Sequence, residues 1–161
     1  MSDYNIMFNK KNSEEEAKKL CYEENWVEEF AEMYRGFNFV VNLNTSLGYR
    51  CGYVEIPVGN ELYEKSYMDL DFESVELTFS GSLKNYPNTH WIGWDHFHFL
   101  DDCCDEDAIR KYNPEMSEDD INKIKDEYWS CRSEIGAMKA SLENVKNEAH
   151  RVIDEIIDKF G

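Results

Sequence analysis

The sequence has no run of apolar residues long enough to cross a membrane, for which about 20 consecutive residues are needed. Residues 1–12 also lack the apolar core of a secretion signal. The five cysteines are odd in number and include no C-x-x-C pair, so the spacing indicates no redox motif. From these absences we expect a cytoplasmic protein whose thiols are free.

Signatures of common catalytic sites are absent as well. There is no G-x-S-x-G, no phosphate-binding loop, no G-x-G-x-x-G and no H-E-x-x-H. Cys51 lies in a predicted strand, but nothing in the sequence pairs it with a base. We therefore predict no catalytic residue and no cofactor, and we expect a protein that binds a partner.

Basic residues are scarce relative to acidic ones. The chain has 17 Lys and Arg against 34 Asp and Glu, which gives a net charge of −17. Such a chain repels nucleic acid and anionic membranes and is attracted to basic surfaces, although acidity also serves solubility alone. We expect no direct contact with nucleic acid or membrane. Hydrophobic residues make up 42% of the chain, which is enough for a packed core.

The N-terminal part of the chain predicts a helix over residues 13–35. Ser13 and Glu16 have the spacing of a capping box, and Gly36 is a typical helix end. The apolar stripe of this predicted helix consists of Leu20, Val27, Phe30, Ala31 and Tyr34.

Residues 37–99 show the two-residue alternation of β-strands. Four strands are predicted, over 37–43, 49–57, 73–81 and 89–99, and the short polar breaks between them indicate an antiparallel sheet. Residues 105–113 predict one short helix. The fold class is therefore α+β, with an α+β domain over residues 1–112.

Residues 113–161 predict a single long helix. Ser117 is a candidate N-cap with Asp120 at the third helical position, and apolar residues then recur in heptads as far as Ile156. About 40 residues would extend about 60 Å, and Gly136 is the only interior break. We expect a coiled-coil homodimer through this helix; the alternative is pairing with residues 13–35 of the same chain.

A stretch rich in His, Asp and Cys, residues 91–108, is the candidate site. His96 and His98 share one face of an extended strand, and Asp101 follows directly, so these three residues would ligate a metal if one is bound. Against a metal, no second ligand group lies elsewhere. The Asp run is also typical of a helix start.

The middle of the chain, residues 49–102, resembles a group of short uncharacterised proteins encoded by phages and prophages. The shared residues are Gly52, Tyr53, Val54, Pro57, Gly59, Tyr63, Leu77, Thr78, Phe79, Ser80, Trp91, Gly93, Trp94, Asp95, His98 and Asp101. The resemblance implies phage origin but no particular activity. It also implies a local network in which Asp95 or Asp101 orients His98, and it does not include His96.

Charge and resemblance together predict an acidic phage protein in the host cytoplasm, an anti-CRISPR-like or other anti-defence inhibitor. It would act as a nucleic-acid mimic and occupy a basic surface of a host defence protein. The predicted binding residues are Glu23, Glu24, Glu28, Glu29, Glu32, Asp101, Asp102, Asp105, Glu106 and Asp107. One alternative is a nucleotide or small-molecule sponge that stacks ligands on sheet aromatics, where a phosphate would need Lys84, Arg110 or Lys111. The other is a metal-dependent hydrolase at His96, His98 and Asp101.

Overall fold

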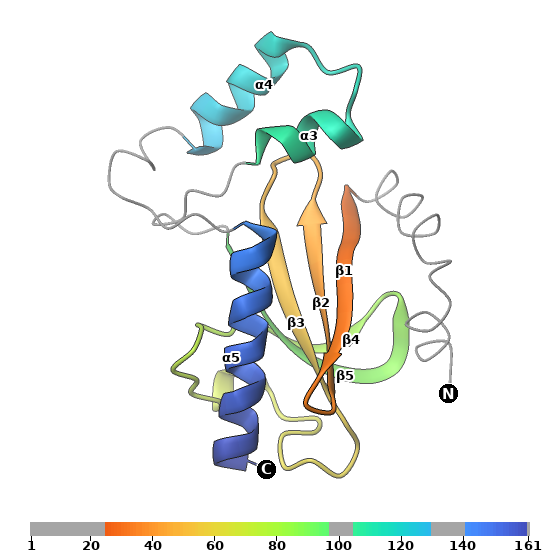
Figure 1. The fold of residues 1–161 in the computed structure, drawn as a ribbon, viewed down its shortest axis with the longest axis vertical. Coiled ribbons are helices and arrows are strands. Elements are labelled where there is room, and N and C mark those ends of the chain that lie inside the picture. Colours follow the sequence, from red (N-terminus) through yellow and green to blue (C-terminus); the bar gives the residue numbers. More distant parts are fainter. Residues whose placement is uncertain (1–24, 97–104, 130–140, 161) are drawn as a thin grey trace.

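The computed structural model describes residues 25–96, 105–129 and 141–160, and it has the predicted α+β class (Figure 1). Five strands form one antiparallel sheet in the order β1-β2-β3-β5-β4. Their bounds are β1 Trp26–Tyr34, β2 Phe37–Asn44, β3 Arg50–Ile56, β4 Phe79–Leu83 and β5 Tyr86–Asp95. Helix α5, Leu142–Phe160, lies against one face of this sheet, while α3, Glu106–Tyr112, and α4, Glu118–Ile124, lie at one end of it.

The predicted N-terminal helix over residues 13–35 is wrong for residues 26–34, which form strand β1. Residues 13–24 lie outside the described part of the chain. Val27 and Phe30 are three residues apart, which suggested a helix. A register shift between Glu28 and Phe30 inserts one extra residue, so that Val27 pairs with Leu43 and Phe30 with Val41. A β-bulge therefore produced the helix-like spacing.

The turn after β1 explains why Gly36 resembled a helix end. Arg35 and Gly36 have φ values of 49° and 88°, and they join β1 to β2 as a two-residue hairpin. Two successive residues with positive φ are typical of the hairpin turn that matches the twist of the strands. Gly36 therefore reverses a strand and does not end a helix.

The other strands were predicted with partly wrong limits, and the described residues form five strands where four were expected. The predicted strand 73–81 forms β4 only from Phe79 onward, and the predicted loop 82–88 contains the β4–β5 hairpin and the start of β5 at Tyr86. Val75 and Leu77 pack in the core from a segment without strand pairing. Residues 97–99 lie outside the described residues.

The C-terminal segment is not one continuous helix. Ser117 caps α4 in a capping box with Asp120, as predicted, but a π-helical turn, Lys125–Trp129, follows α4. Ser141 is not helical, and its Oγ accepts a hydrogen bond of 3.2 Å from the backbone N–H of Asn144 in the first turn of α5. A new helix therefore begins at Leu142, with its own N-terminal cap.

The apolar stripe of α5 belongs to the core of the same chain. Five of its side chains are buried against Phe39, Val54, Ile92 and Trp94 of the sheet. They are Val145, Ala149, Val152, Ile153 and Ile156. A predicted dimer through α5 would have to use other residues. None of the helices in the described ranges is long and apolar enough to cross a membrane.

Candidate functional site

A row of polar residues crosses the sheet face opposite α5. Glu28 on β1 pairs with Asn42 on β2, Asn42 with Cys51 on β3, and Cys51 with Asp95 on β5. Residues directly opposite each other on antiparallel neighbours point to the same face. Register therefore places two carboxylates, an amide and a thiol in one line.

This face of the sheet is concave. The hydroxyl of Tyr86, the first residue of β5, donates a hydrogen bond to Glu28 on β1. In the sheet, β2 and β3 lie between these two strands. The curvature of β4 and β5 is visible in Figure 1. Val40, Tyr86 and Trp91 are buried together inside the curve.

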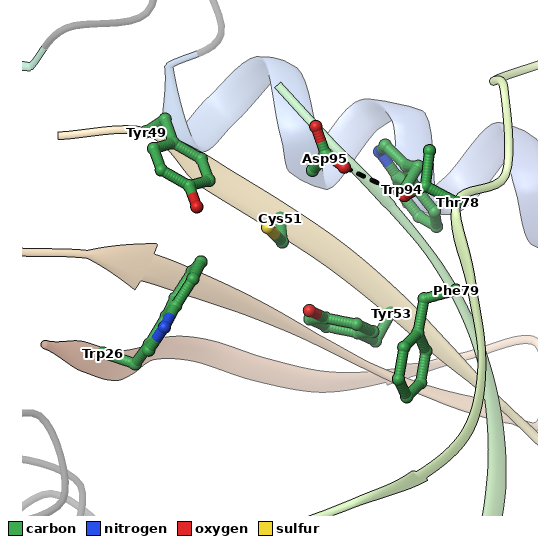
Figure 2. Close-up of a pocket in the computed structure, with 8 residues that line it drawn as sticks. All are labelled: Trp26, Tyr49, Cys51, Tyr53, Thr78, Phe79, Trp94 and Asp95. Atoms are coloured by element: carbon green, nitrogen blue, oxygen red, sulfur yellow. Dashed lines mark hydrogen bonds between the residues drawn. The ribbon is translucent and has the colours of Figure 1, made fainter. Parts of the chain in front are cut away.

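A pocket of about 390 Å³ opens at the Cys51–Asp95 end of the polar row (Figure 2). Five of its lining residues are aromatic, and four of them form two pairs. Trp26 and Tyr49 meet edge to face at 5.4 Å between centroids, and Tyr53 and Phe79 do the same at 5.4 Å. The remaining lining residues are Cys51, Thr78, Trp94 and Asp95.

Glycine on β5 makes room for the Tyr53 ring. Gly93 is the cross-strand partner of Tyr53, and a Cβ at Gly93 would lie 2.4 Å from Cδ1 of that ring. On the other face, a Cβ at Gly52 would lie 2.4 Å from Cζ2 of Trp94. Each aromatic ring therefore lies flat over a glycine of the neighbouring strand.

The groups at the base of the pocket are uncharged. Burial, together with the nearby Asp95 carboxylate, raises the pKa of the Cys51 thiol to about 12. Burial also raises the pKa of Tyr53, so that both groups keep their protons at neutral pH. A protonated thiol is a weak nucleophile. The pocket floor is therefore suited to contact and not to covalent attack.

Asp95 lies at the rim of the pocket and is held in place by its neighbour. Its Oδ2 accepts a hydrogen bond of 3.0 Å from Thr78 Oγ1 (Figure 2). The predicted network with His98 and Asp101 involves residues outside the described part of the chain. Glu28, at the far end of the polar row, has a raised pKa because of burial, which the hydrogen bond from Tyr86 partly offsets.

His96 lies on the opposite face from Asp95 and joins the sheet to α5. Its Nε2 is 2.7 Å from Glu148 Oε1, and Trp94 Nε1 donates to the same oxygen at 3.0 Å. The side chains of His96 and Glu148 are only 8% and 7% exposed. Among the described residues no group of three His, Cys, Asp or Glu could hold a metal ion, and the other two predicted ligands, His98 and Asp101, lie outside them.

The six predicted acidic binding residues that the structure describes differ in their surroundings. Glu29 and Asp105 both bind Arg50, at 2.6 and 2.8 Å, and Asp105 also caps α3. Glu106 pairs with Arg110 and Lys125. Glu28 lies in the polar row, and Glu32 and Asp107 are exposed. The other four, Glu23, Glu24, Asp101 and Asp102, lie outside the described residues.

The aromatic pocket was missed by sequence reasoning, although part of its signal was present. Alternation places Cys51 and Tyr53 on one face of a strand, and Gly93 and Asp95 on one face of another. The register that joins these faces is not visible in the sequence. Lys84, Arg110 and Lys111, the cations proposed for a phosphate, are not among the described lining residues.

Comparison with known proteins gave no relative: no family model matches the chain, and neither a curated protein nor a solved structure is similar to it.

Proposed function

We propose that this protein binds a small organic group in the aromatic pocket opposite α5. The observation that carries the proposal is an open pocket of about 390 Å³ whose aromatic lining includes residues from β1, β3, β4, β5 and the segment before β3. Ligand pockets in proteins are typically concave, mainly apolar and of about 300–1,000 Å³, with a few polar groups that orient the ligand. Asp95 and Thr78 supply polar groups of that kind here.

Binding without turnover is favoured by the chemistry of the lining. The buried thiol of Cys51 is protonated, and the Tyr53 hydroxyl beside it is protonated as well. Neither group is prepared to attack a ligand or to remove a proton from it. Aromatic faces, in contrast, hold flat or compact organic groups by stacking and dispersion.

A fragment titration followed by NMR and tryptophan fluorescence tests the pocket. We expect small organic ligands to perturb Trp26 and the β3 and β5 amides. Phe79→Ala should weaken binding about tenfold, because an aromatic contact is worth about 1 kcal/mol or more. Met68→Ala, at a side chain that is 76% exposed, is the control. Binding that is insensitive to Phe79→Ala would place the ligand elsewhere.

A second candidate is the acidic inhibitor of a basic host defence protein, which the net charge of −17 favours. Five exposed carboxylates lie on α3, α4 and the segment between them. They are Asp107, Glu115, Glu118, Asp119 and Asp120. Carboxylates on a rigid end of a protein can occupy a groove built for phosphates, and such contacts weaken as salt is added.

Capture from a host lysate, with identification by mass spectrometry, tests this second candidate. We expect recovery of a basic nuclease whose retention falls with added salt and with the double substitution Asp107→Asn and Asp119→Asn. Retention that is the same with added salt and with the double substitution would contradict docking by charge.

A further inference from the structure

We propose that the group held in the aromatic pocket is a compact organic cation, a methylated ammonium, enclosed by ring faces and paired with Asp95. This inference rests on the proposed function of the pocket and names the chemistry of its ligand. The geometry of the rings, the charge of the lining and the shortage of hydrogen-bond acceptors each lead to this class.

Four of the rings that line the pocket form two perpendicular pairs. Trp26 and Tyr49 stand at an interplanar angle of 87°, and Tyr53 and Phe79 at 88°. Figure 2 shows the first pair on one side of Cys51 and the second pair on the other. Because both pairs line the same pocket, a ligand there meets aromatic rings on two sides. A cation within about 6 Å of such ring centroids is attracted by each of them.

The charge of the lining has one sign. Among the described lining residues Asp95 is the one carboxylate, and none is Lys, Arg or His. The thiol and the phenol next to it stay neutral, so they offset none of the negative charge. The chain as a whole carries −17, which raises the local concentration of cations and repels anions. A phosphate-bearing ligand is therefore disfavoured here.

Methylation of the ammonium follows from the scarcity of acceptors. A primary ammonium is strongly hydrated, and each of its three N–H donors needs an acceptor after the water is removed. The lining offers mainly ring faces; its one carboxylate, Asp95, already accepts from Thr78 through Oδ2, and its other side-chain oxygens are hydroxyl groups. A trimethylammonium group has no N–H donor, so it can exchange water for aromatic faces without leaving a donor unpaired.

Calorimetric titration of choline against its uncharged carbon isostere, in which a carbon atom replaces the nitrogen, tests the inference. The two probes share shape and hydroxyl group, so the difference between them reports the charge. We expect choline to bind at least about tenfold more tightly, in line with a cation–π contribution of about 1–2 kcal/mol in a partly desolvated site.

Asp95→Asn keeps an acceptor for Thr78 and removes the charge. It should therefore weaken the binding of choline several-fold and leave the binding of the isostere unchanged. Asp71→Asn, at an exposed position, makes the same change in net charge and is the matched control. A cooperative thermal unfolding transition, as in the wild type, shows that each variant folds.

The outcomes separate the inference from the proposed function. If the isostere or an adenine nucleotide binds as tightly as choline or more tightly, the ligand is not selected for positive charge. The cation inference is then wrong, while the pocket remains a ligand site. An equal loss of both probes in Asp95→Asn would also overturn it. If no probe or fragment binds at millimolar concentration, the proposed function fails together with the inference.

Discussion

The guanidinium of Arg50 is enclosed by two carboxylates that are far apart in the sequence. It binds Glu29 through two hydrogen bonds of 2.6 and 2.9 Å and Asp105 through one of 2.8 Å, and the residue is 4% exposed. Glu29 is the extra residue at the bulge of β1, and Asp105 caps α3. One side chain therefore joins β1, β3 and the α3 segment.

Replacing Arg50 by Met leaves Glu29 and Asp105 without their shared cation. We expect the free energy of unfolding to fall by about 3 kcal/mol, the lower end for a broken buried pair, because Asp105 is partly exposed. Urea unfolding measures this change. Arg35→Ala is the control, since its ion pair with Asp154 is exposed and should contribute little. Equal losses of unfolding free energy in the two variants would contradict a stabilising role for the buried ion pairs of Arg50.

Glu155 of α5 holds the loop before β4. It accepts hydrogen bonds of 2.5 Å from Ser74 Oγ, 2.8 Å from the backbone N–H of Glu73 and 2.9 Å from Lys159. Burial favours the protonated form, but these donors outweigh it and lower the pKa of Glu155 to about 2. The ionised carboxylate therefore stabilises the folded state.

The lowered pKa of Glu155 predicts the sign of a pH effect. Its contribution to the free energy of unfolding is complete above the ordinary pKa of about 4.5 and is lost as the pH falls toward about 2. Glu155→Gln should be less stable than the wild type at neutral pH, and the difference should shrink in acid. Unfolding in urea at about pH 6 and about pH 3 checks this; a difference that grows in acid would refute it.

At the scale of elements, the pairing of β3 with β5 positions the pocket. The ring of Tyr53 lies over Gly93, and the ring of Trp94 lies over Gly52, on opposite faces of the same two strands. Small and large residues thus alternate across the pair, which lets large rings lie flat on the sheet.

Gly93→Ala tests this arrangement. The added methyl would collide with the Tyr53 ring, so we expect a loss of about 1–3 kcal/mol in the free energy of unfolding and weaker ligand binding. The double variant Gly93→Ala with Tyr53→Leu should recover part of the stability, because the collision is removed. A double-mutant cycle measures the coupling energy, and additive losses would show that the two side chains do not interact.

At the scale of the whole molecule, charge of one sign dominates. A net charge of −17 on 161 residues destabilises the compact state through repulsion among its carboxylates. Sodium chloride should therefore raise the melting temperature, since about 0.15 M salt screens exposed charges beyond about 8 Å. Calorimetry with and without salt checks this. Sucrose is the uncharged control, and a melting temperature that falls with salt would show that ion pairs outweigh the repulsion.

The predicted homodimer also belongs to this scale. The heptad residues of α5 are buried against β2, β3 and β5, so an association of two chains has to involve other surfaces. The same residues show why a heptad pattern is ambiguous: packing onto a sheet and packing onto a second helix both require one apolar stripe. The pattern alone does not say which partner covers it.

Local patterns in the sequence were enough to predict the α+β class, the approximate positions of β2, β3 and β5, the cap of α4 and the short helix α3. Each depends on residues within one turn or a few positions of one another, such as Ser117 with Asp120. The same local reasoning failed for β1, because a bulge gave Val27 and Phe30 a helical spacing.

Only the tertiary structure decided that Glu28, Asn42, Cys51 and Asp95 form one row, and that Trp26 and Phe79 enclose the same pocket. Strand register and sheet curvature join residues about 70 positions apart, and no local periodicity encodes them. Residue types and local periods were thus read from the sequence itself, whereas the site arose from long-range pairing and was visible only in the folded chain.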